Sequence, residues 1–254
     1  MTAEDRIRAA REDLFVLQSE LVASLAKDKS RARAPLNRQL HTVRGMLNPN
    51  FPYASQAGQD VVIDRIMGQK RGGTFIDVGA YDGVTGSNTM FFERWRDWTG
   101  VLVEPVAEQR AKAELLRKSP CLPYAVADKK GTAAFMAVTE GYTQMSGLID
   151  TYDKAMLERV RADKRHAEKV INVPTRSLSA ILKEVDILHP DFISLDIEGG
   201  ELAVLRKFPF EKHNVGAWAI ENNTADPALP SLMREKGYDL MEFCGPDEIY
   251  TKSR

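Results

Sequence analysis

The sequence predicts an α/β domain built on a mostly parallel seven-stranded sheet with helices on both faces, preceded by an N-terminal helical extension. From residue 55 onward, short apolar segments alternate with amphipathic ones, which is typical of a sheet covered by helices on both faces. The apolar segment 74–80 runs into a glycine-containing turn that leads into a helix. The last two apolar segments flank Gly245-Pro246 and predict an antiparallel hairpin at the end of the sheet.

The pattern places each element along the chain. Strands are expected at residues 74–80, 100–104, 122–127, 133–138, 191–196, 217–221, 240–243 and 248–252. Helices are expected at residues 57–68, 88–96, 107–118, 178–185, 200–207 and 231–236. Residues 139–169 are too many for a simple connection, and long insertions at the ligand end of such sheets often form lids. We therefore predict a cap there, ending in a basic helix over 153–169.

The N-terminal stretch 2–29 lacks glycine and proline and predicts one helix. Apolar residues recur at heptad spacing, at Ile7, Ala10, Leu14, Leu17 and Leu21. This spacing fits a coiled-coil contact between copies and equally a helix lying on its own domain. We predict a homo-oligomer formed through this helix.

The segment that follows is basic. The excess of Lys and Arg in residues 27–45 favours a solvated linker over a contact with an anionic acceptor or lipid headgroup. Pro49 and Pro52 then mark a boundary. We therefore divide the chain into an extension at 1–50 and a main domain at 51–254.

Composition excludes several classes of protein. The chain has 254 residues, enough for one large domain and an appendage, and its net charge of -1 offers no overall attraction to nucleic acid or membranes. No apolar run approaches the roughly 18 residues of a transmembrane span. Cys121 and Cys244 lie in apolar runs and predict buried thiols in a reducing compartment. With early acidic residues arguing against a signal peptide, we expect a cytoplasmic protein.

The turn after residues 74–80 predicts a nucleotide site. Its glycines, Gly79, Gly83 and Gly86, do not fit the G-x-G-x-x-G spacing of dinucleotide-binding proteins, which disfavours a nicotinamide-dependent oxidoreductase. The pattern D-x-G-x-x-x-G, in which the first acid lies at the end of a strand, is instead typical of Rossmann-like methyltransferases. Asp77 is then expected near the ammonium group of the methionine part of S-adenosylmethionine.

Two further acids end the next two expected strands. Glu104 lies roughly twenty residues beyond the glycine turn, where a carboxylate accepts hydrogen bonds from ribose hydroxyls. Asp128 follows the third strand and is expected to accept a hydrogen bond from the adenine amino group. Either acid alone is also compatible with a simple turn. Three acids at successive strand ends favour a cofactor site.

Several segments resemble the FkbM family of methyltransferases. They are Ser55-Gln56-x-Gly58-Gln59-Asp60, Gly73 to Gly83, Val103-Glu104-Pro105, and Ser194-Leu195-Asp196-Ile197-Glu198-Gly199-Gly200-Glu201. The resemblance covers roughly residues 55–252. It implies a Rossmann-like class I methyltransferase fold, S-adenosylmethionine as cofactor, and O-methylation of a hydroxyl on a sugar, glycan or secondary metabolite. Tyr81 stands where a glycine is common in the wider class.

The expected cofactor-binding residues are therefore Asp77, Gly79, Ala80, Tyr81, Asp82, Gly83, Asn88, Glu104, Pro105 and Asp128. Two other functions stay open. One is a non-catalytic nucleotide-binding scaffold protein, and the other is a nicotinamide-dependent oxidoreductase on a similar sheet.

Catalytic residues are expected where the strand at 191–196 ends. Asp196 and Glu198 lie at this ligand edge as the candidate catalytic residues, and Asp196 is expected to act as the base on the acceptor hydroxyl. The alternative for Glu198 is a capping role at the following helix. The next strand ends in Glu221 and Asn222, and oxygen ligands from Asp196, Glu221 and Asn222 would suit Mg²⁺.

The expected cap supplies the acceptor contacts. Tyr142 and Gln144, in its loop-like first part, are candidate substrate-binding residues, with plain surface positions as the alternative. Its basic second part favours either a solvated face or a phosphorylated or nucleotide-linked acceptor. The sequence contains no metal-binding spacing of histidines, no Ser–His–Asp arrangement and no nucleic-acid-binding motif.

Overall fold

The computed structural model describes residues 1–253 and contains a seven-stranded, mixed sheet in the order β10-β11-β9-β8-β1-β2-β3. Six strands are parallel, and β11 runs antiparallel to both of its neighbours. The strands are β1 Thr74–Val78, β2 Thr99–Val103, β3 Cys121–Leu122, β8 Phe192–Leu195, β9 Ala217–Glu221, β10 Tyr238–Cys244 and β11 Asp247–Lys252. The predicted Rossmann-like fold class and the closing hairpin are confirmed.

The strand order places a ligand site. The chain runs outward from β1 to β3 and then returns to the other side of β1 with β8. At such a reversal the connections leave in opposite directions, so a crevice opens at the carboxyl ends of the two central strands. The backbone N–H of Asp196 donates to the oxygen of Val78 over 3.1 Å, which brings the ends of β1 and β8 together.

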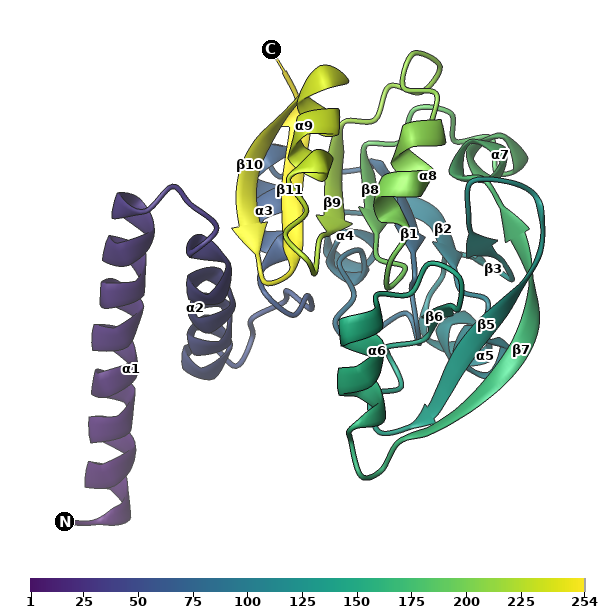
Figure 1. The fold of residues 1–254 in the computed structure, drawn as a ribbon. Helices are drawn as coiled ribbons and strands as arrows, with labels where there is room; N and C mark the ends of the chain where they lie inside the picture. Colours follow the sequence, from purple (N-terminus) through teal and green to yellow (C-terminus); the bar gives the residue numbers. More distant parts are fainter. Residues whose placement is uncertain (254) are drawn as a thin grey trace.

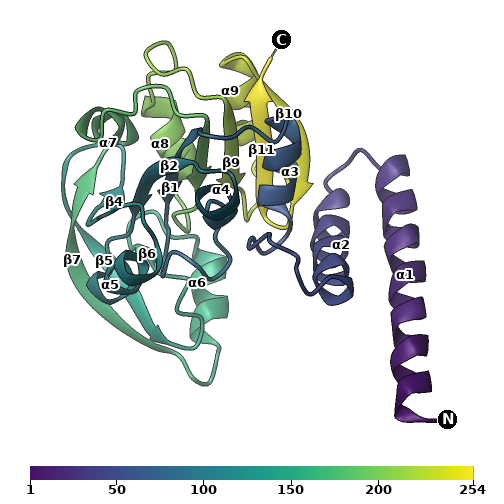
Figure 2. The ribbon, with the colours of Figure 1, turned by 180° about the vertical axis from the view of Figure 1, so that it is seen from behind.

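Helices cover both faces of the sheet (Figures 1 and 2). One face packs against α7 Leu178–Glu184, α8 Glu201–Lys207 and α9 Ala228–Glu235 around buried side chains such as Trp218 and Ile76. The other face packs against α3 Gln59–Ile66, α4 Met90–Trp95 and α5 Ala107–Leu116 around Phe75 and Phe192. Because side chains alternate along each strand, neighbouring residues such as Phe75 and Ile76 join different halves of the core.

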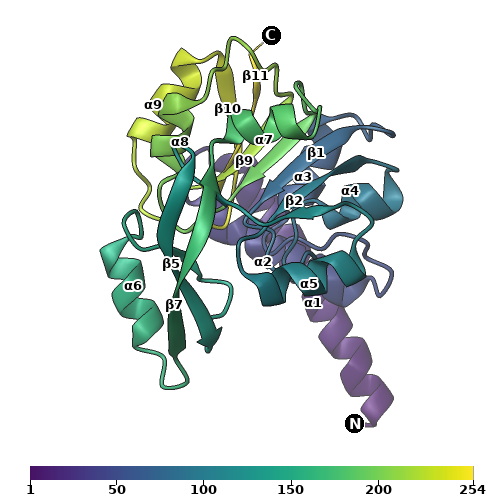
Figure 3. The ribbon, with the colours of Figure 1, turned by 90° about the vertical axis from the view of Figure 1, so that its right-hand side faces the viewer.

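A second sheet of four strands lies beside the first, in the order β4-β7-β5-β6 (Figure 3). Its strands are β4 Ala125–Val126, β5 Gly131–Glu140, β6 Gly147–Leu148 and β7 Ala167–Arg176. The expectation of one strand at 122–127 was wrong, because the chain passes Pro123 and leaves the main sheet after β3. β4 then pairs with β7 instead.

The expected basic helix at 153–169 is also shorter in the structure. Helix α6, Lys154–Arg161, ends eight residues early, and β7 begins at Ala167 and pairs antiparallel with β5. The β-branched residues Val170, Ile171, Val173 and Thr175 signal this strand. Pro174 and the neighbouring charges obscured that signal.

The N-terminal extension is a helical hairpin of α1, Ala3–Lys27, and α2, Arg33–Leu47. The single helix expected at 2–29 is confirmed, but the solvated linker expected at 27–45 was wrong. Its arginines pair with acids on the β10–β11 hairpin: Arg31 with Glu248, and Arg33 with Glu242. These ion pairs join the start of α2 to acids near the C-terminal end of the sequence, and they fix α2 against the sheet.

Only part of α1 is covered. Leu21 and Leu25 are buried against α2, whereas Ile7 is 63% exposed, and the N-terminal turns extend past the end of α2 (Figures 1 and 3). The expected contact between copies stays a prediction. Among the described residues, no helix has the length and apolar character that crossing a membrane requires. Both cysteines are unpaired and buried, as predicted.

Candidate active site

A cavity of ≈ 430 Å³ opens at the carboxyl ends of β1, β2, β8 and β9. This volume is within the range of roughly 300–1,000 Å³ that small-molecule and cofactor sites occupy. Six carboxylates from separate strands and turns line it: Asp77, Glu104, Asp196, Glu198, Glu221 and Asp247. The concentration of negative charge fits a cationic ligand.

The glycine turn after β1 shapes the floor of the cavity. Gly79 has φ +80°, and a Cβ there would lie 1.7 Å from the backbone oxygen of Asp196. Only glycine therefore lets the turn pass this close to the end of β8. Tyr81 also has a positive φ of 51°, and its hydroxyl lies 2.7 Å from that of Thr143.

Asp77 is buried at the end of β1 and lines the cavity. Its Oδ2 accepts hydrogen bonds from the hydroxyls of Thr89, at 2.5 Å, and Ser87, at 3.3 Å. Burial raises the pKa of this carboxyl, and the nearby charge of Arg117 opposes the shift. Arg117 also donates to the oxygen of Gly83 over 2.7 Å, so one buried guanidinium holds both the acid and the glycine turn.

Glu104 lies just after β2, the strand that pairs with β1, and also lines the cavity. Its two oxygens accept backbone hydrogen bonds from Val106, at 2.7 Å, and Tyr81, at 3.1 Å. Burial raises its pKa to about 7, although these hydrogen bonds lower it. The carboxylate is thus fixed in direction, and its remaining lone pairs are free for a ligand's hydroxyls.

The other expected cofactor residues divide into two groups. Ala80, Asn88 and Pro105 line the cavity together with Gly79 and Tyr81. The Oδ1 of Asn88 is buried and has no hydrogen-bond partner within residues 1–253, so it is free to bind a ligand. Asp82 and Gly83 do not line the cavity.

Asp82 and Gly83 build the turn instead. Asp82 accepts backbone hydrogen bonds from Val84 and Thr85, at 2.9 and 2.7 Å. A Cβ on Gly83 would lie 2.9 Å from the Cγ of Arg117. Both residues therefore act on the cavity through the backbone that they fold.

Asp128 is exposed and lies outside the cavity, contrary to expectation. The physical reason is the division of the expected third strand: Asp128 follows β4, which belongs to the second sheet. Tyr124, Ala125 and Val126 line the cavity in its place. The three-acid pattern thus brings together Asp77 and Glu104 but not Asp128.

Asp196, Glu198 and Glu221 form a compact carboxylate cluster at the other end of the cavity. One oxygen from each lies within 4.8 Å of the others. Glu198 has a positive φ of 58°, which turns its side chain to the same side as Asp196. Glu198 is not the helix cap that the alternative proposed, because α8 begins after Gly200 and no side chain in the described part of the chain caps it. The neighbouring Glu201 instead accepts the backbone hydrogen bonds of Ile197 and Gly199.

The cluster is electrostatically strained. Burial, together with the charges of Asp247 and Glu201, raises the pKa of Asp196 to about 8. The pKa values of Glu198 and Glu221 also lie well above the usual range, through burial and then through repulsion from Asp196. The Oδ1 of Asp196 and the Oε2 of Glu198 are buried without a hydrogen-bond partner among residues 1–253. Such atoms are stabilised by a proton, a cation or a ligand's donor.

Asn222 does not join this cluster, so its place in the expected metal site was wrong. Its side-chain amide donates to Glu248 at 2.9 Å, and its Oδ1 accepts from the backbone of Asp226 at 2.8 Å. Because side chains alternate along a strand, Asn222 points to the opposite side from Glu221, the last residue of β9. Its hydrogen bonds fix the loop between β9 and α9. Asn223 lines the cavity instead.

Asp247 is a site residue that the sequence reasoning missed. It is buried, accepts from Gln59 at 3.0 Å and from Asn88 at 3.4 Å, and burial raises its pKa to about 6. Because β11 is antiparallel to β9, its first residue pairs with the last residue of β9, Glu221. The sequence did contain a signal for Asp247, because it predicted that the chain ends in an antiparallel hairpin. The first residue of an antiparallel last strand lies at the edge of the sheet where the parallel strands end.

Tyr142 and Gln144, the expected substrate-binding residues, both line the cavity. Gln144 donates to the backbone oxygen of Thr85 at 3.3 Å, and Tyr142 is 49% exposed. The segment between β5 and β7 therefore covers one side of the cavity, and these two residues lie between the glycine turn and solvent.

The strand order, the glycine turn and the acids at strand ends define a class I methyltransferase fold with a nucleotide-type cavity. The family model described as the methyltransferase FkbM domain matches residues 77–240, well over half of the chain. The chain therefore belongs to the FkbM family of methyltransferases, and S-adenosylmethionine is the methyl donor to which this class of fold is suited. Among proteins with curated descriptions, none matches it.

Solved structures resemble the chain at low identity. The FkbM methyltransferase of Methylobacillus flagellatus has 14% identity and a TM-score of 0.47, covering 98% of this chain and 60% of its own. The present chain thus spans about three fifths of that protein. The N-terminal domain of human METTL16 has 13% identity and a TM-score of 0.44, covering 89% of this chain and 82% of its own. The strand order establishes the fold class of this chain, and the match to the family model establishes its family.

Proposed function

We propose that this protein transfers a methyl group from S-adenosylmethionine to a hydroxyl of a sugar, glycan or other secondary metabolite. One observation carries the proposal: a single cavity has Asp77 and Glu104 at one end and the carboxylate cluster of Asp196, Glu198 and Glu221 at the other. The first pair fits a nucleoside with a cationic amino-acid part. The cluster fits a step that releases a proton.

The residues present fit the methyl donor. Glu104 has free lone pairs for the two ribose hydroxyls, and Asn88 offers an unpaired oxygen beside Asp77. The buried carboxylates favour a sulfonium and an ammonium over a neutral ligand. When bound, S-adenosylmethionine supplies an electrophilic methyl carbon: the acceptor oxygen attacks it, the carbon–sulfur bond breaks, and the electron pair remains on sulfur.

The protein's own contribution is to hold the acceptor and remove its proton. A sugar hydroxyl is a poor nucleophile near neutral pH, and a positioned base typically contributes about 10²–10⁴-fold. Asp196 is the best placed base, because its pKa of about 8 makes it more basic than an exposed carboxylate and its Oδ1 has no competing partner. The hydroxyl proton passes to this oxygen as the new carbon–oxygen bond forms.

We also propose that the cluster binds a divalent cation such as Mg²⁺. The donor set fits, because Asp196, Glu198 and Glu221 offer hard oxygen ligands and two of the oxygens lack a partner. Glu198, and not the predicted Asn222, is the third member of this donor set. A bound cation would lower the pKa of an acceptor hydroxyl and relieve the repulsion between the three acids. It would also occupy Asp196 and lower its pKa, so metal activation of the hydroxyl is an alternative to general-base catalysis by Asp196.

The first experiment is calorimetry with S-adenosylhomocysteine and, separately, with NAD. We expect S-adenosylhomocysteine to bind, the Asp77→Asn variant to bind at least about tenfold more weakly, and NAD not to bind. Binding of NAD alone would instead support an oxidoreductase.

The second experiment measures label transfer from methyl-labelled S-adenosylmethionine to a panel of hydroxylated sugars and metabolites. Asp196→Asn is expected to slow transfer by about 10²–10⁴-fold while S-adenosylhomocysteine still binds. A fully active Asp196→Asn variant refutes the assigned base. Binding of the cofactor with no transfer to any hydroxylated acceptor supports the non-catalytic scaffold. Unchanged activity after exhaustive EDTA treatment refutes the metal requirement.

A further inference from the structure

The cavity has an uneven distribution of charge from its floor to its opening. Its six carboxylates are buried or nearly so, whereas the two arginines that line it, Arg38 and Arg159, are exposed. The arginines come from different elements, α2 and α6. The cavity therefore has an acidic floor and a cationic rim.

Arg38 is placed by the contacts that fix α2. The backbone oxygen of Ala34, one helical turn before Arg38, accepts a hydrogen bond from Gly245 at 3.2 Å, and Asn37 donates to the oxygen of Phe243 at 2.8 Å. The guanidinium consequently lies over the β10–β11 turn: a Cβ on Gly245 would be 2.8 Å from Nη2 of Arg38. This turn, through Pro246 and Asp247, borders the acceptor end of the cavity.

Arg159 is placed by the opposite wall. Met156, Arg159 and Val160 are spaced i, i+3, i+4 on α6, and all three line the cavity. Figure 1 shows α6 below the ends of β8 and β9, and α2 beside the lower end of the β10–β11 hairpin. The two arginines therefore belong to the two elements that flank the carboxylate cluster.

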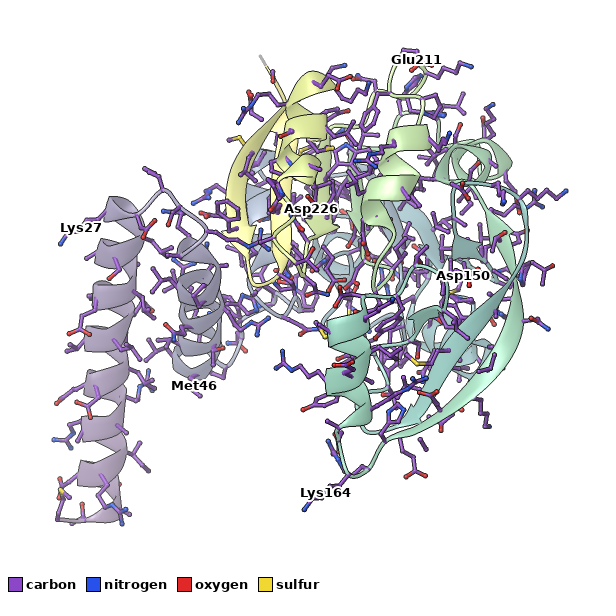
Figure 4. The ribbon with its side chains drawn as sticks, viewed as in Figure 1. Lys27, Met46, Asp150, Lys164, Glu211 and Asp226 are labelled. Atoms are coloured by element: carbon purple, nitrogen blue, oxygen red, sulfur yellow. The ribbon has the colours of Figure 1, made fainter. Side chains whose placement is uncertain are left out.

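Both arginines are available for a ligand. Neither guanidinium makes a hydrogen bond or ion pair within residues 1–253, although the charge of Arg38 lowers the pKa of Asp247. Three other basic residues of the α6 segment do not point into the cavity. Arg161 pairs with Glu168, Arg165 pairs with Asp163, and Lys164 points away from the body of the molecule (Figure 4).

We propose that Arg38 and Arg159 bind an anionic group of the acceptor, a phosphate, diphosphate or carboxylate, while its reacting hydroxyl lies at the carboxylate cluster below. This inference rests on the proposed methyl transfer and specifies its substrate class. A planar guanidinium recognises an oxyanion through two parallel hydrogen bonds, so two of them fix the acceptor's orientation as well as its affinity. The acidic floor repels the same group, and the acceptor is thereby held in one direction.

The test is calorimetry on protein saturated with S-adenosylhomocysteine, with inorganic pyrophosphate and glucuronate as separate probes. We expect saturable binding of pyrophosphate, weakened at least about tenfold in Arg38→Gln and in Arg159→Gln. The matched controls are Arg44→Gln on α2 and Arg161→Gln on α6, neither of which lines the cavity, and both should bind like the unchanged protein. Saturable binding of glucuronate alone, with the same response to the variants, would identify a carboxylate as the recognised group.

The proposal is overturned if neither probe binds saturably, or if the controls weaken binding as much as the cavity variants. A failed proposed function is distinguishable, because it would appear in the preceding step as a failure of S-adenosylhomocysteine to bind the unchanged protein. Titrating S-adenosylhomocysteine into Arg38→Gln and Arg159→Gln checks that both variants are folded, since neither residue belongs to the proposed cofactor-binding set.

Discussion

Gly79 and the backbone oxygen of Asp196 are so close that no side chain fits between them. A Cβ on Gly79 would lie 1.7 Å from that oxygen. The cofactor turn after β1 and the catalytic end of β8 therefore share one contact. A change at the turn is transmitted directly to the proposed base.

Gly79→Ala is expected to destabilise the protein by about 3 kcal/mol or more, because it adds a clash to the cost of a positive φ. Gly68→Ala is the matched control, since Gly68 has φ +60° and nothing within 4 Å of its Cβ position. It should cost only about 1–2 kcal/mol. Urea unfolding measures both, and equal losses would mean that the close approach does not matter.

Arg117 is expected to be the most important ion-pair residue for the cofactor turn. Its pair with Glu93 has side chains only 0% and 4% exposed, and breaking a buried pair costs about 3–5 kcal/mol. Arg117→Met should therefore lose about that much stability and also weaken S-adenosylhomocysteine binding. Arg71→Met removes an ion pair to Asp97 that is 62% and 68% exposed, and it should cost less than about 1 kcal/mol. Similar losses in the two variants would contradict the assignment.

The parallel sheet and the first two acids could be predicted because each depends on local signals: a strand, a glycine turn and an acid in sequence. Asp128 was misassigned because its strand leaves the main sheet, which depends on pairing with β7 more than forty residues later. Arg38 reaches the cavity because contacts between α2 and the β10–β11 hairpin, such as the ion pair of Arg33 with Glu242, fix α2 there. Contacts over such separations leave no periodic signal in the sequence.

Stability is expected to fall as pH rises from about 5 to about 8. The buried acids, including Asp196, Glu198 and Glu221, have raised pKa values, so the folded state holds protons that the unfolded state has already released. Thermal unfolding across this range measures the effect. Glu221→Gln removes one charge from the cluster and should reduce the slope, and added Mg²⁺ should raise the melting temperature most at the upper pH. A melting temperature that rises over this range would contradict the raised pKa values.

The rate of methyl transfer should rise with pH over the same range. A base must be deprotonated to act, and burial raises the pKa of Asp196 to about 8, so kcat/KM should increase with an apparent pKa near 8. Asp196→Asn should lower kcat by about 10²–10⁴-fold and flatten the profile. A variant that is slow but keeps the same pH profile would assign the base to another residue, with Glu198 the first to test.

Affinity for the cofactor product should depend on Glu104. Its pKa of about 7 means that the free protein is partly protonated below neutrality, whereas ribose hydroxyls bind best to the carboxylate. Binding must then release a proton, so the affinity for S-adenosylhomocysteine should fall by up to about tenfold for each pH unit below 7. Calorimetry between about pH 5.5 and 8.5 in buffers of different ionisation enthalpy measures both the affinity and the proton released. Glu104→Gln should bind more weakly at pH 8 and lose most of the pH dependence. If the variant keeps the full dependence, the titrating group is Asp77 or Asp247, whose pKa values burial also raises.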